Sequence, residues 1–450
     1  MFQSIKLTNK LRAVLLSLTL LGSIHAAAQY LPETQLSLDE CIKIALNDNP
    51  TIKIKDMEIK RVDYSHKEAL GQLLPNVNFS GQYTRNLAIQ TIYMTTPEGS
   101  TSIKMGRDNT YSTGFNASVP LVMPTLWKSI KLSDNQILQN VEAARANKLS
   151  LVNQVKNAYY ALLLAEDSKR AIEENHATAQ FNADVFQKKF DLGTASEYDV
   201  LRARVEVTNL EPSIIEADNA IETLELQLKV LMGMDVRTDF KPSQKLDDFK
   251  IQMYNDVLAT DTSLVNNTSL KSLDLQTDYL KKSLDVTRMA WYPTLNGSFN
   301  YMWNSMSNGS PFKNFDWHPS SSVGLTLTLP LFTGGQRLYK QRQAEVALRE
   351  MRWQRENLQR SLQMQVQTQM NLINRTVKQI ESNEAGVRQA TKANDIMEQS
   401  FKMGVGTFIQ LLDTEDALLY ARLSYYQAIH DYLVAQSNLE YLLGNTHYVH

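Results

Sequence analysis

The 450-residue chain contains a single cysteine, Cys41. One cysteine cannot form an internal disulfide, so packing alone has to hold the folded chain together. Ser37 and Glu40 have the spacing of a helix capping box, and Leu36 and Cys41 stand where a hydrophobic staple places its two apolar contacts. We therefore interpret Cys41 as a structural residue.

The sequence also lacks a long apolar run. Beyond the N-terminus no segment has the ~18 consecutive apolar residues that a transmembrane helix needs. At the N-terminus, three basic residues precede an apolar stretch at 13–21 that is too short to span a bilayer, and small residues follow at 26–28. This is the pattern of a cleavable export signal. We predict that residues 1–28 are a signal peptide and that the mature chain is exported.

Groups for nucleic-acid binding or catalysis are sparse. The chain has 46 basic and 48 acidic residues, and three of the basic ones lie in the predicted signal, so the mature chain is net acidic and is not expected to bind nucleic acid. The seven histidines are scattered, and no glycine-rich phosphate loop, metal-ligand cluster or nucleophile elbow is present. We predict that the chain is not an enzyme and has no cofactor or bound metal.

The second half of the sequence repeats residues of the first half. Landmarks of the first half recur 210 to 218 residues later: Ser112, Gly114, Pro120 and Leu121 as Ser322, Gly324, Pro330 and Leu331; Phe190, Gly193, Leu201, Leu231 and Gly233 as Phe401, Gly404, Leu412, Leu442 and Gly444; Asn49 and Pro75 as Asn267 and Pro293. Such a repeat predicts an internal duplication. Its parts are a first copy at 29–233, a linker at 234–262, a second copy at 263–444 and a tail at 445–450.

Each copy has the same order of elements: helix, strand, polar loop, strand, very long helix, turn and second helix. No proline lies between Pro124 and Pro212, and none follows Pro330. This absence predicts long helices at 125–191 and 336–402, each about 100 Å at 1.5 Å per residue. A turn follows each long helix, at 192–196 and 403–407. A second helix follows each turn, at 197–232 and 408–443, and its apolar heptad seam predicts coiled-coil packing against the long helix.

The remaining segments alternate between apolar and polar residues. They are at 76–87, 111–121, 294–304 and 321–332, and polar loops at 88–110 and 305–320 separate the two strands of each copy. A length of ~9–11 residues suits a tilted strand that crosses a bilayer with one face in lipid. Four aromatic residues near the loop ends suit an aromatic girdle: Tyr83, Tyr111, Tyr301 and Trp303. The alternative is one face of a soluble sheet.

The order of elements fixes an orientation. Both strands of each copy join helices at one end and a polar loop at the other, so all helices lie on one side of the membrane, which for an exported chain is the periplasm. Four strands cannot close a barrel, because the smallest barrels have about eight, and open edges are not tolerated in lipid. We therefore expect the chain to oligomerise around a pore.

Together these features resemble the TolC-like outer membrane efflux family over the whole mature chain. The most specific marks are the turns Phe190-Asp191-Leu192-Gly193 and Phe401-Lys402-Met403-Gly404, and the Leu-Met-Gly and Leu-Leu-Gly that close the copies. The resemblance implies a membrane α+β fold in which a homotrimer, four strands from each protomer, forms a twelve-stranded barrel in outer-membrane lipid. Below it, antiparallel helices form a periplasmic α-barrel.

The resemblance also implies partners. An inner-membrane pump of the RND or ABC type would deliver the substrate, and a periplasmic adaptor protein would dock on the two turns. The residues of this chain at those turns are Gly193, Thr194, Ala195, Gly404, Val405 and Gly406.

At the narrow end of the tunnel, the best-known member of the family carries two aspartates one helical turn apart. Gln410 and Asp413 occupy those places here, so one charge per protomer remains. Asp199 matches an aspartate that latches the closed tip, but Phe401 and Gly406 stand where the latch has a tyrosine and an arginine. The candidate gate residues are therefore Asp413, Gln410 and Asp199.

A structural interpretation of two gate candidates remains open. Ser196 with Asp199, and Thr407 with Gln410, have capping-box spacing at a helix start, so the side chains could satisfy free backbone amides.

The leading functional hypothesis is a passive outer-membrane duct that exports drugs, metals or secreted protein. The alternative is a trimeric coiled-coil adhesin or scaffold without a conducting pore.

Overall fold

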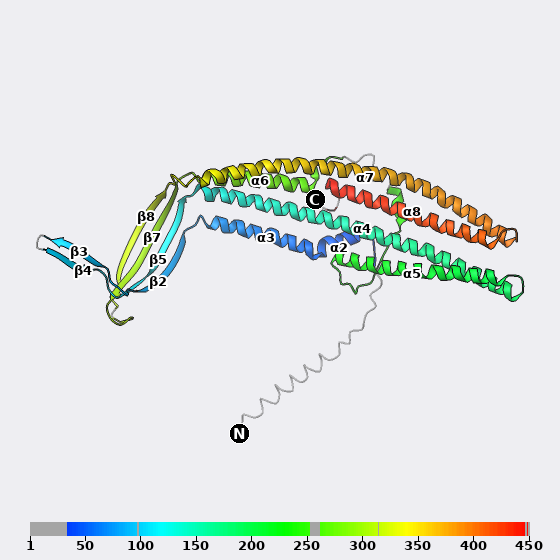
Figure 1. The fold of residues 1–450 in the computed structure, drawn as a ribbon, viewed down its shortest axis with the longest axis horizontal. Helices are drawn as coiled ribbons and strands as arrows, with labels where there is room; N and C mark the ends of the chain where they lie inside the picture. Colours follow the sequence, from blue (N-terminus) through cyan, green and yellow to red (C-terminus); the bar gives the residue numbers. More distant parts are fainter. Residues whose placement is uncertain (1–33, 97–98, 253–261, 314, 446–447, 449–450) are drawn as a thin grey trace, which may run out of the picture.

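The computed structural model describes residues 34–96, 99–252, 262–313, 315–445 and Tyr448. The predicted signal peptide, residues 1–28, lies outside this part, as do 253–261 of the predicted linker and most of the predicted tail. The described chain is elongated, with a β-sheet at one end and two helical hairpin tips at the other (Figure 1).

The sheet contains four antiparallel strands in the order β2-β5-β7-β8. Their bounds are Asn76–Arg85 for β2, Asn109–Val122 for β5, Thr294–Ser307 for β7 and His318–Thr328 for β8. Within the described residues β2 and β8 pair on one side only, so each leaves a row of backbone N–H and C=O groups without a strand partner.

The alternation of all four strands is in register. Val77 lies opposite Ala117, which lies opposite Phe299, which lies opposite Val323. Since opposite residues share a face, one face of the sheet is apolar and the other carries mostly Asn, Ser and Thr. Many side chains of the apolar face are exposed, including Val77, Phe79, Phe115, Phe299, Val323, Leu325 and Leu327.

Two long helices run from the sheet to the far tips. They are α4, Pro124–Asp191, and α7, Gln336–Lys402, with 68 and 67 residues. At the tips each turns back into a 36-residue helix, α5 at Glu197–Met232 and α8 at Phe408–Leu443. Within the described residues, no helix combines the length and the apolarity that a membrane span requires.

Shorter helices pack beside the sheet-proximal halves of α4 and α7. They are α3, Pro50–Gly71, and α6, Thr268–Met289, both with 22 residues. Helix α4 packs along α3, α5, α6 and α8, and α7 packs along α6 and α8, so α4 lies at the centre of the helical layer (Figure 1).

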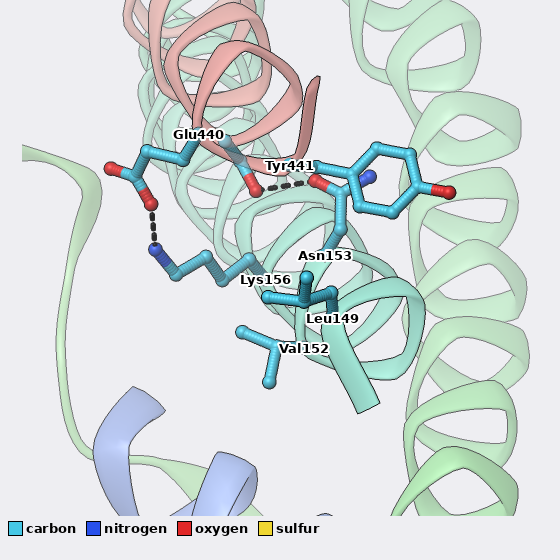
Figure 2. A pocket seen from close by; sticks show the side chains of 7 residues that line it. Leu149, Val152, Asn153, Lys156, Glu440 and Tyr441 are labelled. Atoms are coloured by element: carbon cyan, nitrogen blue, oxygen red, sulfur yellow. Dashed lines mark hydrogen bonds and ion pairs between the residues drawn. The ribbon is translucent and has the colours of Figure 1, made fainter. Parts of the chain in front are cut away.

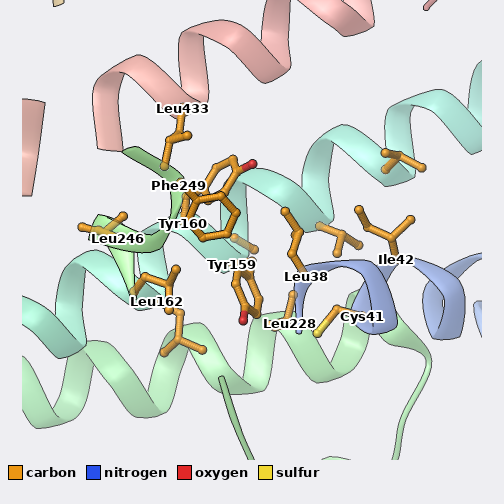
Figure 3. Close-up of a cluster of buried hydrophobic side chains, with 14 of the residues drawn as sticks. Leu38, Cys41, Ile42, Tyr159, Tyr160, Leu162, Leu228, Leu246, Phe249 and Leu433 are labelled. Carbon is orange, nitrogen blue, oxygen red and sulfur yellow. The ribbon is translucent and has the colours of Figure 1, made fainter. Parts of the chain in front are cut away.

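The main apolar core lies about halfway along the helices. There α2, Leu38–Asp48, and the 3-10 helices η1, Leu246–Gln252, and η2, Leu264–Asn266, pack near a parallel pair of short strands, β1 at Thr34–Leu36 and β6 at Phe240–Pro242. Figure 3 shows aromatic and aliphatic side chains from α2, α4, α5, η1 and α8 meeting in this core.

Cys41 belongs to that core. The capping box of Ser37 and Glu40 is present, and Cys41 is fully buried in the same cluster as Leu36. Burial raises the pKa of the Cys41 thiol to about 12, so the thiolate form is disfavoured.

The repeat landmarks meet at two equivalent junctions. The side-chain amide of Asn49 donates to the carbonyl of Leu231 at 2.8 Å, and that of Asn267 donates to Leu442 at 2.7 Å. Each asparagine also caps the helix that follows it. The glycine after each leucine motif has φ near +70° and no room for a Cβ against the facing backbone. Close backbone approach thus explains why both copies end in glycine.

The outer loops differ from the prediction. Within the predicted loop at 88–110 the chain forms a β-hairpin of β3, Thr91–Thr96, and β4, Gly99–Lys104. Its many Thr and Ser residues look like loop composition, but Thr, Ile and Tyr favour strands. Residues 305–307, predicted as loop, extend β7. Strand β8 is displaced toward the N-terminus relative to 321–332 and ends before Pro330, which cannot donate a ladder hydrogen bond.

Ile373→Ala tests the core. Ile373 on α7 is fully buried in the main cluster, so truncation should cost ~2–5 kcal/mol and lower the melting temperature of the detergent-purified protein. Met364→Ala on the same helix, where the side chain is 63% exposed, is the matched control and should melt close to the wild type. Equal melting temperatures for both variants would contradict the assignment of Ile373 to the core.

Candidate functional site

The turn between α4 and α5 is a helix C-terminal Schellman motif. Gly193 has φ 76°, its N–H donates to Phe190 O at 2.8 Å, and Thr194 N–H donates to Lys189 O at 2.8 Å. These two bonds satisfy carbonyls at the end of α4. Glycine suits this position because side chains rarely tolerate a left-handed backbone.

The turn between α7 and α8 has the same geometry. Gly404 has φ 77° and donates to Phe401 O at 3.0 Å, while Val405 N–H donates to Ser400 O at 3.0 Å. Three apolar side chains are left open to solvent at the two tips: Leu192, Met403 and Val405, at 79%, 72% and 81% exposure. The predicted docking turns are therefore tightly folded and present apolar groups.

Two of the three gate candidates make helix caps. The Ser196 hydroxyl accepts from Asp199 N–H, and the Asp199 carboxylate accepts from Ser196 N–H at 3.3 Å. Thr407 and Gln410 form the equivalent box, with Thr407 N–H donating to Gln410 Oε1 at 3.0 Å. The capping interpretation of Asp199 and Gln410 thus describes contacts that the structure contains.

Asp413 is placed differently. It lies one turn beyond Gln410 on α8, is exposed, and has no hydrogen-bond or ion-pair partner among the residues that the structure describes. Its charge adds to burial in raising the pKa of Asp416, one further turn along the helix. Asp413 therefore lacks the capping contacts that hold Asp199 and Gln410.

An aromatic cluster joins the two hairpins near their tips. Phe186 of α4 lies 4.2 Å from Phe408 of α8 and 5.9 Å from Phe401 of α7, between ring centroids. Lys189 Nζ lies 5.0 Å above the Phe401 ring. Phe401 thus makes an apolar and cation–π contact between hairpins where the resemblance suggested a tyrosine hydroxyl.

A buried carboxyl group lies two turns above the tip. Glu415 of α8 is 8% exposed and accepts from the side-chain amide of Asn182 on α4 at 3.2 Å. Burial, opposed by this hydrogen bond and reinforced by the charges of Asp416, Glu206 and Glu398, raises the pKa of Glu415 to about 7. Sequence analysis missed this pair, because a carboxylate on a long polar helix is normally solvated and only the packing of α4 on α8 buries it.

Farther up the helices, a small pocket lies between α4 and α8 (Figure 2). Lys156 Nζ bonds Glu440 at 2.6 Å beside it, and Ser437 donates to Asn153 at 2.6 Å. The space suits about one water molecule, so the polar groups there serve to join the two helices.

Comparison with known proteins agrees with this geometry. The family model described as "Outer membrane efflux protein" matches residues 41–234 and 259–445. The chain is 22% identical to outer membrane protein TolC of Vibrio cholerae, covering 83% of this chain and 82% of that protein. It is 25% identical to the alkaline protease secretion protein AprF of Pseudomonas aeruginosa, covering 91% and 84%.

A solved structure shares the fold. The outer membrane channel CmeC of Campylobacter jejuni superimposes with a TM-score of 0.74 at 17% identity, covering 90% of this chain and 85% of that chain.

Glu415→Gln tests the buried carboxyl. With its pKa raised from 4.5 to about 7, folded Glu415 keeps a proton that an unfolded chain has lost. The contact between α4 and α8 should therefore weaken as pH rises from about 4.5 to 7 and stay constant above that range. Hydrogen exchange at residues 411–419, corrected for its intrinsic pH dependence, should speed up across this window in the wild type and less in the variant.

Glu197→Gln at the exposed tip of α5 is the control and should follow the wild type. An identical pH response in Glu415→Gln would show that Glu415 does not carry the effect.

Proposed function

The chain belongs to the outer membrane efflux protein family, and from this we propose that it is the trimeric outer-membrane duct of a multi-component export system. The family membership predicted from the repeat and the turn motifs is thereby confirmed. The protein is an outer-membrane protein of a channel family, not of an enzyme family, with a long periplasmic extension. The proposal concerns its assembly, its partners and its substrate path.

The observation that carries the proposal is the two-faced sheet with open edges. Its apolar face is exposed across β2, β5, β7 and β8, and its opposite face is polar. In lipid each unpaired backbone group costs several kcal/mol, so β2 of one protomer would pair with β8 of the next. Three protomers would close a barrel of twelve strands, with the polar face around a water-filled lumen.

The helices continue this lumen into the periplasm. At 68 and 67 residues, α4 and α7 reach about 100 Å, and α5 and α8 double their far halves. Three copies would form an α-barrel below the β-barrel. The equal or nearly equal lengths of the corresponding helices, α3 and α6, α4 and α7, and α5 and α8, support an internal duplication, with six similar hairpins around the axis.

The tips are the proposed contact with a periplasmic adaptor. Exposed Leu192, Met403 and Val405 surround backbone turns fixed by Gly193 and Gly404, which supplies apolar anchors on a rigid support. An RND or ABC pump in the inner membrane would provide the energy. Asp413 is the proposed gate residue, because three copies would converge at the narrow end and favour cations.

The substrates proposed are small toxic compounds, such as drugs or metal ions, or a secreted protein. The name of AprF refers to secretion of an alkaline protease, which supports secreted protein as one of the proposed substrate classes. A polar, water-filled lumen is compatible with either class.

Conductance in a planar lipid bilayer tests the duct. Purified mature protein should insert and give ion currents in steps of uniform size. A trimeric adhesin with a solid helical core would give no current. A monomer that stays soluble without detergent would contradict both the trimeric duct and the trimeric adhesin.

Asp413→Ala tests the gate. Divalent cations added on the periplasmic side should block the wild type, and the variant should lose several-fold in sensitivity, since each removed carboxylate weakens the cation site. Asp184→Ala, which removes an exposed carboxylate of α4 bonded to Gln180, is the control and should retain block. Unchanged block in Asp413→Ala would exclude Asp413 from the gate.

A further inference from the structure

The outermost rows of the apolar face are polar. Asn109 pairs with Ser307, and Tyr111 pairs with Ser305, so both serines lie on the face that carries Tyr83 and Phe115. On the membrane-facing surface that we propose, hydroxyl and amide groups without partners would be costly. Yet Asn109, Ser305 and Ser307 are 0%, 1% and 5% exposed.

The connection between β7 and β8 supplies hydrogen bonds to Ser305 and Asn109, whereas the Ser307 hydroxyl has no hydrogen-bond partner among the described residues. Asp316 N–H donates to Ser305 Oγ at 3.0 Å, and the amide of Asn109 donates to the carbonyl of Gly309 at 3.1 Å. Phe312 N–H donates to the Tyr111 hydroxyl at 2.8 Å. The connection is therefore fixed on the apolar face by hydrogen bonds at several points along its length.

In place of the covered groups the connection presents aromatic rings. Phe315 meets the Tyr111 ring edge-on at 4.9 Å, Phe312 lies 5.1 Å from Tyr83, and Trp317 stacks on Phe315 at 5.8 Å. The outward sides of Phe312, Phe315 and Trp317 remain 65%, 44% and 40% exposed. Tyr111 beneath them is 4% exposed.

We propose that residues 308–313 and 315–317, the outer strap, lie on the lipid-facing side of the barrel and bind the outer-leaflet interface of the bilayer. Amphipathic aromatic rings prefer that level of a membrane. The strap lies at the end of the sheet farthest from the helices, which is the outer side (Figure 1). Its contacts are with residues of the apolar face and with Asp108, next to the start of β5. This inference depends on the proposed placement of the apolar face in lipid.

Tryptophan fluorescence in vesicles of phosphatidylcholine with brominated acyl chains tests the strap. The five tryptophans allow single-tryptophan variants in which the other four are replaced by phenylalanine. Trp317 alone should lose emission in brominated vesicles, more strongly with bromine near the carbonyl end of the chains than near the methyl end.

Two matched variants serve as controls. Trp303 alone, on the apolar face one row inside Tyr111, should be quenched, and Trp353 alone, 71% exposed on α7, should not. Quenching of Trp303 without quenching of Trp317 would overturn the strap and leave the proposed duct intact. If Trp303 also kept its emission, the apolar face would not contact lipid, and both proposals would fall.

Discussion

The unpaired backbone groups at the outer edges of β2 and β8 are the constraint on which the rest of the molecule depends. Within the described residues a single chain pairs neither of these edges and leaves much of the apolar face between them exposed, so the sheet is incomplete by itself. In the proposed trimer the same contact removes the edges and encloses the polar face. The long helices then lie on one side of the proposed barrel, because β2, β5, β7 and β8 all connect to helices at the same end of the sheet. The proposed pore, its orientation and the proposed tunnel thus follow from the unpaired backbone groups of β2 and β8.

The sequence predicted best what depends on local chemistry. Helices α5 and α8 start at the capping boxes of Ser196 and Thr407 and stop at Gly233 and Gly444, signals that are readable without tertiary structure. The absence of proline likewise predicted the great length of α4 and α7 from the sequence alone. The β3–β4 hairpin was missed, because a strand exposed on both faces has no apolar alternation to reveal it.

The candidate site was less predictable, because burial there depends on which helices meet. From the sequence, Glu415 is one of several acidic residues on a helix expected to be solvated. Packing against α4 buries it and brings it to the amide of Asn182. The outer strap is similar. In the sequence its aromatic residues lie in an irregular loop, and their role becomes visible only because β5 and β7 place Tyr111 and Ser305 beneath them. Both features depend on contacts between residues about 200 positions apart, and sequence periodicity does not predict such contacts.

The two tips have the same backbone geometry but different side chains. Both have a Schellman turn followed by a capping box, yet the acceptor at the third helical position is a carboxylate in Asp199 and an amide in Gln410. Capping needs only an oxygen, so it tolerates either group. The proposed gate needs charge, and on α8 the carboxylate one turn deeper, Asp413, takes part in no cap. In this proposal the cap depends on Asp199 and Gln410 and the gate charge on Asp413, so the charge could change without loss of the cap.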